Sequence, residues 1–208
     1  MKRILLPLIV TASAVGIFLL LLFHRPVLEV DVAVIHPQPA EKTVLTAGKV
    51  TDRTHVQLFL RESLADTIQE GQPAVVNGVG FRRKNYPGTV VAVAKEATVQ
   101  NGKTGLLADV LLDESQTDDS IKPGLTATVR ITVEMFESVM VAEESWFLAE
   151  SDTPAVYVLK DGKAVRRRVT VLEQVDGGII VEGLSENEQV ILHPQSVRDR
   201  QNVKEKQA

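Results

Sequence analysis

The sequence contains no cysteine, three methionines and four histidines among 208 residues. The absence of cysteine excludes a disulfide framework and any metal site built from thiolates. The histidines stand in unrelated contexts, at His24, His36, His55 and His193. No pair has the i, i+4 spacing of two ligands on one helix face, or a clear i, i+2 spacing on a strand. Three methionines are too few for a relay of soft metal ions. We therefore expect no metal site and no cofactor.

Motifs that carry catalysis are also missing. The sequence has no G-x-S-x-G nucleophile turn, no P-loop and no G-x-G-x-x-G fingerprint. The pair Gly78 and Gly80 lies in a loop with no phosphate-binding feature after it. These absences predict that the protein is not an enzyme and that it works by binding or scaffolding.

Positive charge is in the minority. The net charge is −4, and −7 remains once Lys2, Arg3 and Arg25, which flank the first apolar run, are set aside. An acidic domain is a poor binder of nucleic acid or of anionic lipid surfaces. The basic clusters also lack the interleaved aromatic residues on which bases stack. We therefore expect no nucleic-acid partner.

One long apolar run, residues 4–23, carries no charge and is long enough to cross a lipid bilayer. The triplet Ala12-Ser13-Ala14 resembles a signal-peptidase site, but it divides the run instead of following it. We interpret the run as an uncleaved transmembrane helix and not as a cleaved signal. The positive charges before it place the N-terminus in the cytoplasm and the bulk of the chain outside.

The rest of the sequence is predicted to be mainly β. Its best strand, residues 125–133, alternates apolar residues with threonine and arginine, which indicates one buried and one solvated face. Further strands are expected over residues 89–94, 106–112 and 189–192. Asp161-Gly162 between two apolar runs predicts a tight hairpin. Turn signals recur about every 10 residues, a spacing typical of a sandwich, roll or barrel.

Residues 63–71 are the exception, because Ser63 and Gly71 suit the start and end of a short helix. The acidic stretch of residues 113–120 is interpreted as a solvated loop, and residues 197–208 as a polar, flexible tail.

Three groups of residues are candidates for contacts with a partner. The basic cluster Arg82, Arg83 and Lys84 is either a solvated hairpin tip or a docking site for an acidic partner or lipid headgroups. Alternation along a strand sends Arg166 and Arg168 to one face and Arg167 to the other, as on an edge strand or a wet face. The pair Trp146 and Phe147 is either a core anchor or a contact platform.

Several segments, taken in order, resemble the bacterial periplasmic adaptor subunits, also called membrane fusion proteins, that serve ABC-type and RND-type exporters. They are VQLFLRESLADTIQEGQPAVV, YPGTVVAVA, IKPGLTATVRITV, VMVAEESWFL, VYVLKDGKAVRRRVTV and VEGLSENEQVIL, over residues 54–195. The resemblance implies a β-barrel domain followed by a membrane-proximal β domain. The implied organisation is an anchor over residues 1–26, membrane-proximal strands over 27–53, the barrel over 54–137, the membrane-proximal domain over 138–196 and the tail over 197–208.

The departure from the family lies at residues 51–54. Family members place a lipoyl-like domain and a long helical hairpin between the first strands and the barrel, and only these four residues stand there in this chain. We therefore predict that neither module is present. We also interpret residues 45–50 and 56–60 as the end of one domain and the start of the next, and not as neighbouring strands of one meander.

The resemblance implies a truncated adaptor-like accessory subunit in the inner membrane, single-pass, with most of the chain in the periplasm. Its partner would be an inner-membrane transporter permease, with an ABC-type transporter favoured over an RND-type one. Homo-oligomers or other adaptor subunits are further possible partners. The alternative hypothesis is a free-standing envelope protein whose β-barrel domain binds a small ligand or a cell-wall component.

Overall fold

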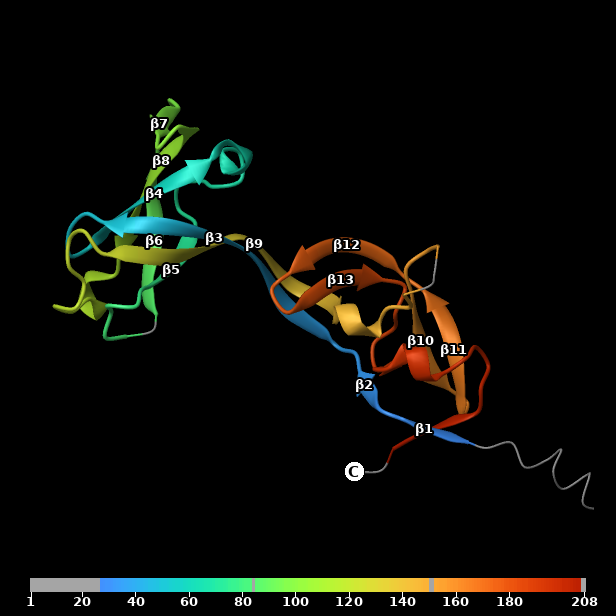
Figure 1. The fold of residues 1–208 in the computed structure, drawn as a ribbon. Helices are drawn as coiled ribbons and strands as arrows, with labels where there is room; N and C mark the ends of the chain where they lie inside the picture. The colour runs from blue at the N-terminus through green and yellow to red at the C-terminus, as the bar shows by residue number, and fades with distance from the viewer. Residues whose placement is uncertain (1–26, 84, 150–151, 207–208) are drawn as a thin grey trace, which may run out of the picture. The chain divides into compact units, whose positions relative to one another are not determined.

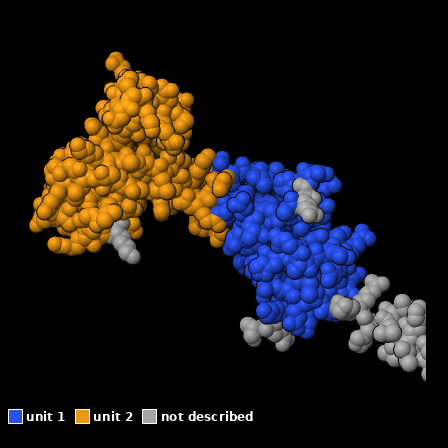
Figure 2. Space-filling model, viewed as in Figure 1, with its two compact units in different colours: residues 1–37, 140–173, 178–208 blue, residues 38–139, 174–177 orange. Residues whose placement is uncertain are grey.

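The computed structural model describes residues 27–83, 85–149 and 152–206. This part of the chain contains fifteen strands and four short 3₁₀ turns, so its fold class is mainly β, as predicted (Figure 1). It divides into two compact units (Figure 2). We call residues 38–139 and 174–177 the barrel unit, and residues 1–37, 140–173 and 178–208 the terminal unit.

The barrel unit is a six-stranded barrel. Its strands follow one another around the barrel in the order β9, β3, β4, β8, β6 and β5, and β5 pairs back with β9 to close it. The bounds are β3 (Pro37–Val50), β4 (His55–Arg61), β5 (Pro73–Asn77), β6 (Tyr86–Val93), β8 (Lys103–Leu112) and β9 (Thr126–Ala142). A short strand, β7 (Thr98–Gln100), pairs with the start of β8.

Alternating apolar residues build the barrel because every second side chain of a strand points inward. Val56, Leu58 and Leu60 of β4 are fully buried, and Val129 and Ile131 of β9 lie in the same core. The alternation predicted for residues 125–133 is confirmed, since Thr126, Thr128 and Arg130 between the buried apolar residues are exposed. Apolar side chains therefore fill the barrel interior.

The connection at residues 51–54 differs from the prediction. β3 and β4 are neighbouring antiparallel strands, with Gly48 opposite Leu58 and Val50 opposite Val56, so the interpretation of residues 45–50 and 56–60 as non-neighbours was wrong. Asp52 turns the chain, because its Oδ1 accepts the backbone N–H of Thr54 (2.8 Å) and of His55 (2.9 Å). The hydrogen bond from the Thr54 N–H, followed by one from the His55 side chain, lowers the pKa of Asp52 to about 2.

This hairpin has two consequences for the predicted domains. Residues 38–50 lie in the barrel unit, although the strands of residues 42–50 were expected in the membrane-proximal domain. The four residues between β3 and β4 form a turn, so no lipoyl-like domain and no helical hairpin is inserted there.

The helix predicted over residues 63–71 is only a 3₁₀ turn, η1 (Glu62–Leu64), followed by hydrogen-bonded turns. The side chain of Gln72 explains the early end. Its Oε1 accepts the N–H of Gln69 (3.0 Å) and its Nε2 donates to the carbonyl of Thr67 (2.9 Å), which replaces helical hydrogen bonds with side-chain bonds.

The terminal unit contains a four-stranded sheet in the order β11, β10, β14 and β2. These strands are β2 (Val32–Val34), β10 (Ala155–Lys160), β11 (Lys163–Arg168) and β14 (Gln189–Ile191). The hairpin predicted at Asp161-Gly162 is confirmed, since both residues have positive φ (50° and 70°) and Lys160 pairs with Lys163. Strands β12 (Thr170–Val175) and β13 (Gly178–Glu182) follow, and β13 pairs with the end of β9.

The C-terminal segment is a structural part of this unit, so the expectation of a flexible tail was wrong for residues 197–206, the part of it that the structure describes. β15 (Val203–Glu205) pairs in parallel with β1 (Leu28–Val30). Val197 and Val203 are buried in a cluster with Tyr157 and Ile191. The segment is polar overall, but these two valines bury it against the sheet, and the Val203 N–H donates to Gly162 O (2.9 Å).

The predicted transmembrane segment, residues 4–23, lies outside the described residues. In the part of the chain that the structure does describe, no helix has the length and hydrophobicity needed to cross a membrane.

Candidate docking surface

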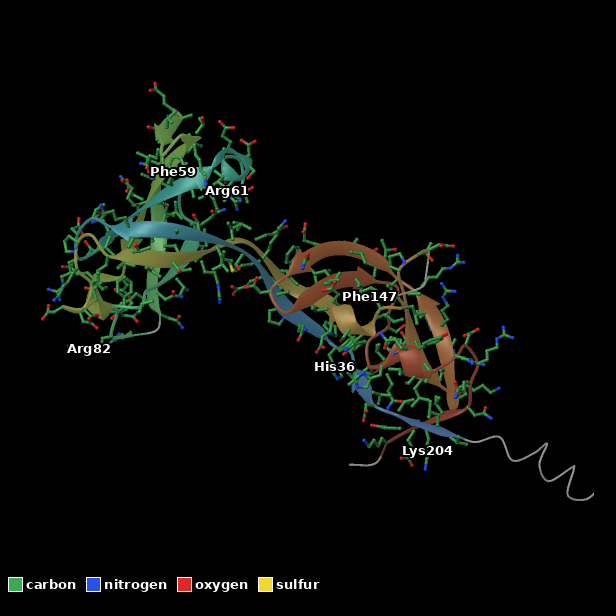
Figure 3. The ribbon with its side chains drawn as sticks, viewed as in Figure 1. His36, Phe59, Arg61, Arg82, Phe147 and Lys204 are labelled. Atoms are coloured by element: carbon green, nitrogen blue, oxygen red, sulfur yellow. The ribbon has the colours of Figure 1, made fainter. Side chains whose placement is uncertain are left out.

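The candidate contact residues fall into both units. Arg82 and Arg83 belong to the barrel unit, and the other described candidates belong to the terminal unit. Lys84 lies outside the described residues. Figure 3 labels Arg82 and Phe147 as representatives of the two groups.

The basic loop between β5 and β6 has exposed side chains on a fixed backbone. The N–H of Arg82 donates to Ser120 Oγ (2.8 Å), and the N–H of Arg83 donates to the Tyr86 hydroxyl (3.1 Å). Tyr86 is fully buried, and its hydroxyl donates to Asp118 Oδ2 (2.7 Å). The hydroxyl of Ser120, then Tyr86, then the Ser120 N–H hold the pKa of Asp118 at about 2. The acidic loop predicted over residues 113–120 therefore anchors the basic loop.

This network predicts a specific acid sensitivity. Because Asp118 has a lower pKa in the folded protein than its ordinary value of 3.8, its contribution to stability is complete above pH 4 and is lost as the pH falls toward 2. We expect Asp118→Asn to lose less stability than the wild type between pH 6 and pH 3, as measured by urea unfolding. Asp119→Asn, at an exposed neighbour, is the control and should behave as the wild type. Equal losses in the wild type and in Asp118→Asn would contradict the assignment.

Trp146 and Phe147 lie at the 3₁₀ turn η3 (Glu144–Trp146). Trp146 is buried in a core cluster with Ile35, Val156 and Val181. The core interpretation of Trp146 is confirmed, and its side chain offers little surface to a partner. Phe147 is half-buried and forms an antiparallel β-bridge with Val156. The bridge holds the chain beside β10 at this point.

The three arginines of β11 alternate as predicted. Arg166 and Arg168 are exposed, and Arg167 turns to the other side, where its guanidinium lies 2.8 Å from Glu188 Oε1. Glu188 is well buried for a carboxylate and also accepts the N–H of Ser185 (2.9 Å). Arg167 therefore holds the loop before β14, and Arg166 and Arg168 are the two arginines of β11 with side chains at the surface.

β11 is the first strand of its sheet, but its free edge is covered by the C-terminal segment. Ala164 N donates to Gln201 O (2.9 Å), and Arg200 N donates to Ala164 O (2.7 Å). Arg166 N donates to Asp199 Oδ1 (3.0 Å). The backbone of this edge is therefore occupied, and a partner would meet mainly side chains here.

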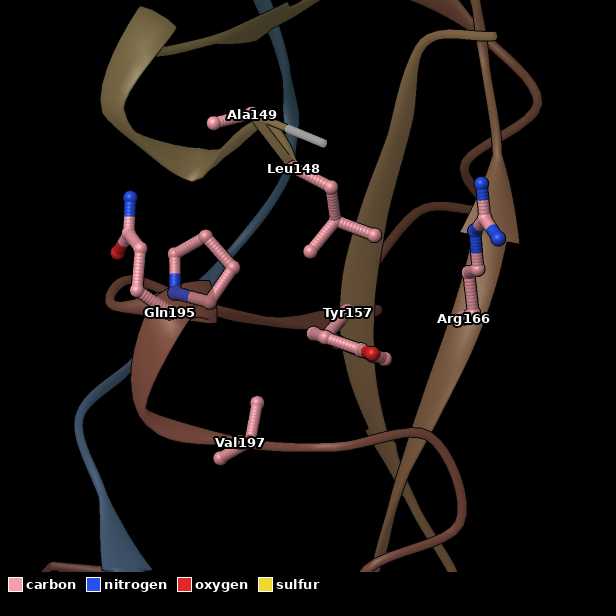
Figure 4. A pocket seen from close by; sticks show the side chains of 7 residues that line it. Leu148, Ala149, Tyr157, Arg166, Gln195 and Val197 are labelled. Carbon is pink, nitrogen blue, oxygen red and sulfur yellow. The ribbon is translucent and has the colours of Figure 1, made fainter. Parts of the chain in front are cut away.

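A hollow of about 390 Å³ lies between η3, the β10–β11 hairpin and the 3₁₀ turn η4 (Pro194–Ser196) (Figure 4). It is lined by Leu148, Ala149, Tyr157, Arg166, Pro194, Gln195 and Val197. Leu148, Pro194 and Val197 make an apolar surface, and Arg166 and Gln195 add polar groups. Its volume falls within the range of small-ligand sites. We call this hollow, with the exposed side chain of Arg168 on the same strand, the docking surface.

Sequence reasoning identified Arg166 but missed Pro194, Gln195 and Val197, because they were assigned to the end of a domain and to a tail. Two isolated valines in a polar segment, Val197 and Val203, were the available signal that this segment packs against the rest of the unit. In the described residues, no group of three or more histidine and acidic side chains is arranged to hold a metal ion.

No family model matches the sequence, and no curated protein matches it. Solved structures do match. MacA from Actinobacillus actinomycetemcomitans is 15% identical, with a TM-score of 0.51, over 66% of this chain and 41% of that chain. ZneB from Cupriavidus metallidurans is 18% identical, with a TM-score of 0.33, over 70% and 41% of the two chains. A putative efflux transporter from Bacteroides eggerthii is 19% identical, with a TM-score of 0.34, over 74% and 50%.

The matched chains are longer, and this chain spans 41% to 50% of their lengths. Over the part that it matches, the chain has the fold of MacA, which is the membrane-fusion-protein fold that the sequence resemblance predicts.

Proposed function

We propose that the protein is an adaptor-like accessory subunit that binds the periplasmic face of an inner-membrane transporter and couples or modulates export. The observation that carries this proposal is the fold, which matches that of MacA, together with the turn of only four residues between β3 and β4 of the barrel unit. With neither a lipoyl-like domain nor a helical hairpin between β3 and β4, the described residues retain the parts of an adaptor that would act at the inner membrane.

The mechanism we propose is differential binding. A subunit that contacts two conformations of a transporter with different affinity shifts their populations and needs no chemistry of its own. The docking surface suits this role because it combines apolar area with the side chains of Arg166, Arg168 and Gln195 on strands and turns that are held by a packed core. The basic loop of Arg82 and Arg83 is a second proposed contact, on the barrel unit.

The partner we favour is an ABC-type transporter, with an RND-type transporter second. Photo-crosslinking tests the choice: benzoylphenylalanine replaces Gln195, which is exposed at the rim of the hollow, and the captured protein is identified by mass spectrometry. We expect a transporter permease, whose class then decides between the two types. The same crosslinker in place of Val99, an exposed valine of the barrel unit, is the control and should capture far less. Recovery of no transporter at Gln195 would contradict the proposal.

The second candidate is a free-standing envelope protein that binds a small ligand. The apolar core that fills the barrel leaves the hollow of the terminal unit as the better place for such a ligand. Native mass spectrometry of the full chain from cell extracts distinguishes the two functions, because this candidate expects a bound small molecule that Leu148→Trp displaces.

A further inference from the structure

The basic loop between β5 and β6 carries a fully exposed apolar side chain at its tip. Residues 78–81 form a turn, because the N–H of Phe81 donates to the carbonyl of Gly78 (3.1 Å). The ring of Phe81 packs edge-on against Tyr86 and holds the turn on the barrel core. Val79 lies at the tip of this turn, and its side chain is fully exposed. The loop therefore presents an apolar tip on a fixed backbone.

A groove of about 300 Å³ lies on the same unit, between the turn before β5 and the middle of β9. It is lined by residues 69–73 and 132–135, and we call it the acidic groove. Met135 gives it an apolar floor that is 65% exposed. The turn on its other side is held in place, since Gly71 N donates to Val90 O (2.8 Å) and Val90 N donates to Gln72 O (2.9 Å). A groove with fixed walls binds a partner without first having to be ordered.

The charges of the loop and of the groove are opposite. None of the nine described residues that line the groove is basic, and the exposed carboxylates of Glu70 and Glu134 form no ion pair within the described ranges. Residues 77–83 include no acidic residue. Arg82 lies close enough to Asp118 to help lower the pKa of that carboxyl, so its charge is partly balanced within the chain. Arg83 is exposed and is the cation that the loop offers to a partner.

The loop of one chain cannot enter the groove of the same chain. The groove includes Pro73, the first residue of β5, and the loop follows Asn77, its last residue. β5 is paired with β9 along this length, with Ala74 opposite Ile131 and Asn77 opposite Thr128 (Figure 1). A paired strand of the barrel does not fold back on itself, so the loop and the groove stay at its opposite ends. An occupant of the groove has to come from another chain.

We propose that the basic loop of one copy of this chain inserts into the acidic groove of a second copy, with Val79 against Met135. Arg83 then faces the carboxylates of Glu70 and Glu134, so opposite charges surround an apolar contact and fix its orientation. The two surfaces differ, so the contact is head-to-tail, and every added copy offers a free loop or groove to the next.

This contact goes beyond the proposed function and does not rest on it. A loop that fills a groove cannot also contact a transporter, so the assembly is the state of the chain away from its transporter. The purified chain alone tests the self-contact, whereas crosslinking at Gln195 tests the transporter, so failure of one is distinguishable from failure of the other.

Crosslinking tests the head-to-tail contact, because the chain has no cysteine of its own. We expect the full-length chain with both Val79→Cys and Met135→Cys, in mild detergent with a short bismaleimide, to form covalent dimers, trimers and higher species. A mixture of the two single variants should stop at dimers, since each copy then carries one cysteine. Either single variant alone should give at least tenfold less dimer than the mixture. As much dimer from Val79→Cys alone as from the mixture would indicate a symmetric contact and would overturn the proposal.

Charge exchange tests the same contact without a covalent bond. Arg83→Glu and Glu70→Arg each bring like charges together, so we expect each to raise the dissociation constant in analytical ultracentrifugation at least tenfold. An equimolar mixture of the two variants restores opposite charges between unlike copies, and its dissociation constant should return to that of the wild type. Lys95→Glu makes the same change of charge at an exposed site between β6 and β7, and it should leave the constant unchanged.

All the replaced side chains are exposed, so the variants should keep the circular dichroism spectrum of the wild type. A wild type that stays monomeric, a mixture that stays dissociated, or an equal loss of association in Lys95→Glu would contradict the contact.

Discussion

Replacing Gly105 by alanine is expected to destabilise the barrel unit by about 3 kcal/mol. A Cβ atom at this position would lie 2.2 Å from the carbonyl oxygen of Leu60 and 2.8 Å from Cζ of Phe59. The carbonyl belongs to the backbone of β4, which is fixed by its pairing with β8 from His55 to Arg61. The strands must separate to admit the methyl group, and the barrel loses part of this ladder.

Two spectroscopic probes together distinguish the units. The single tryptophan, Trp146, lies in the core of the terminal unit, whereas far-ultraviolet circular dichroism reports strands of both units. In urea unfolding we expect Gly105→Ala to lower the midpoint of the dichroism transition and to leave the tryptophan transition in place. Gly80→Ala is the matched control, because its new methyl group would meet only Leu125, at an ordinary 3.4 Å. A midpoint for Gly105→Ala equal to that of the control would show that β4 and β8 adapt without cost.

Much of the barrel was predictable because its strands carry their pattern locally. Residues 125–133 alternate over a length that only a half-buried strand explains, and the structure buries Ala127, Val129 and Ile131 together. The hairpin at Asp161-Gly162 was equally local, since the turn requires positive φ at both residues. The closure of the barrel by β5 and β9 was implied only by the family resemblance. Two strands that pair across about 50 residues carry no local sequence pattern that reveals the pairing.

At the Asp52 turn, the resemblance to the adaptor family led to a wrong prediction about the neighbouring strands. The absence of an inserted module was correctly inferred from the short spacing between residues 50 and 55. The conclusion that the flanking strands belong to different domains did not follow from that spacing. A four-residue connection favours adjacent antiparallel strands, and an aspartate that accepts the next N–H groups is a turn signal in its own right.

The docking surface was predictable in part. The period of two along β11 placed Arg166 and Arg168 on one face and Arg167 on the other, and this holds in the structure. The burial of Trp146 also follows from its size and its apolar neighbours. The hollow did not follow from the sequence, because it is made by a C-terminal segment that returns to β10 and β11 from more than 30 residues away.

Replacing Val203 by aspartate is expected to destabilise the terminal unit by about 4 kcal/mol, the largest single effect that we predict. Val203 is 1% exposed and packs with Val30, Tyr157 and Ile191. Its N–H donates to Gly162 O (2.9 Å), so the backbone cannot easily turn the new carboxylate toward water. The substitution removes apolar burial and places an unpaired charge in the cluster. The tryptophan transition of Trp146 should then shift to lower urea concentration.

The same substitution at an exposed valine separates burial from a general effect of negative charge. Val34 lies on β2 in the same unit and is 45% exposed, so Val34→Asp should cost less than about 1 kcal/mol. If the C-terminal segment is the structural strand that pairs with β1, the two variants differ strongly. If residues 203–205 were a solvated tail in solution, Val203→Asp would unfold at the same urea concentration as Val34→Asp, and the parallel pairing of β15 with β1 would be refuted.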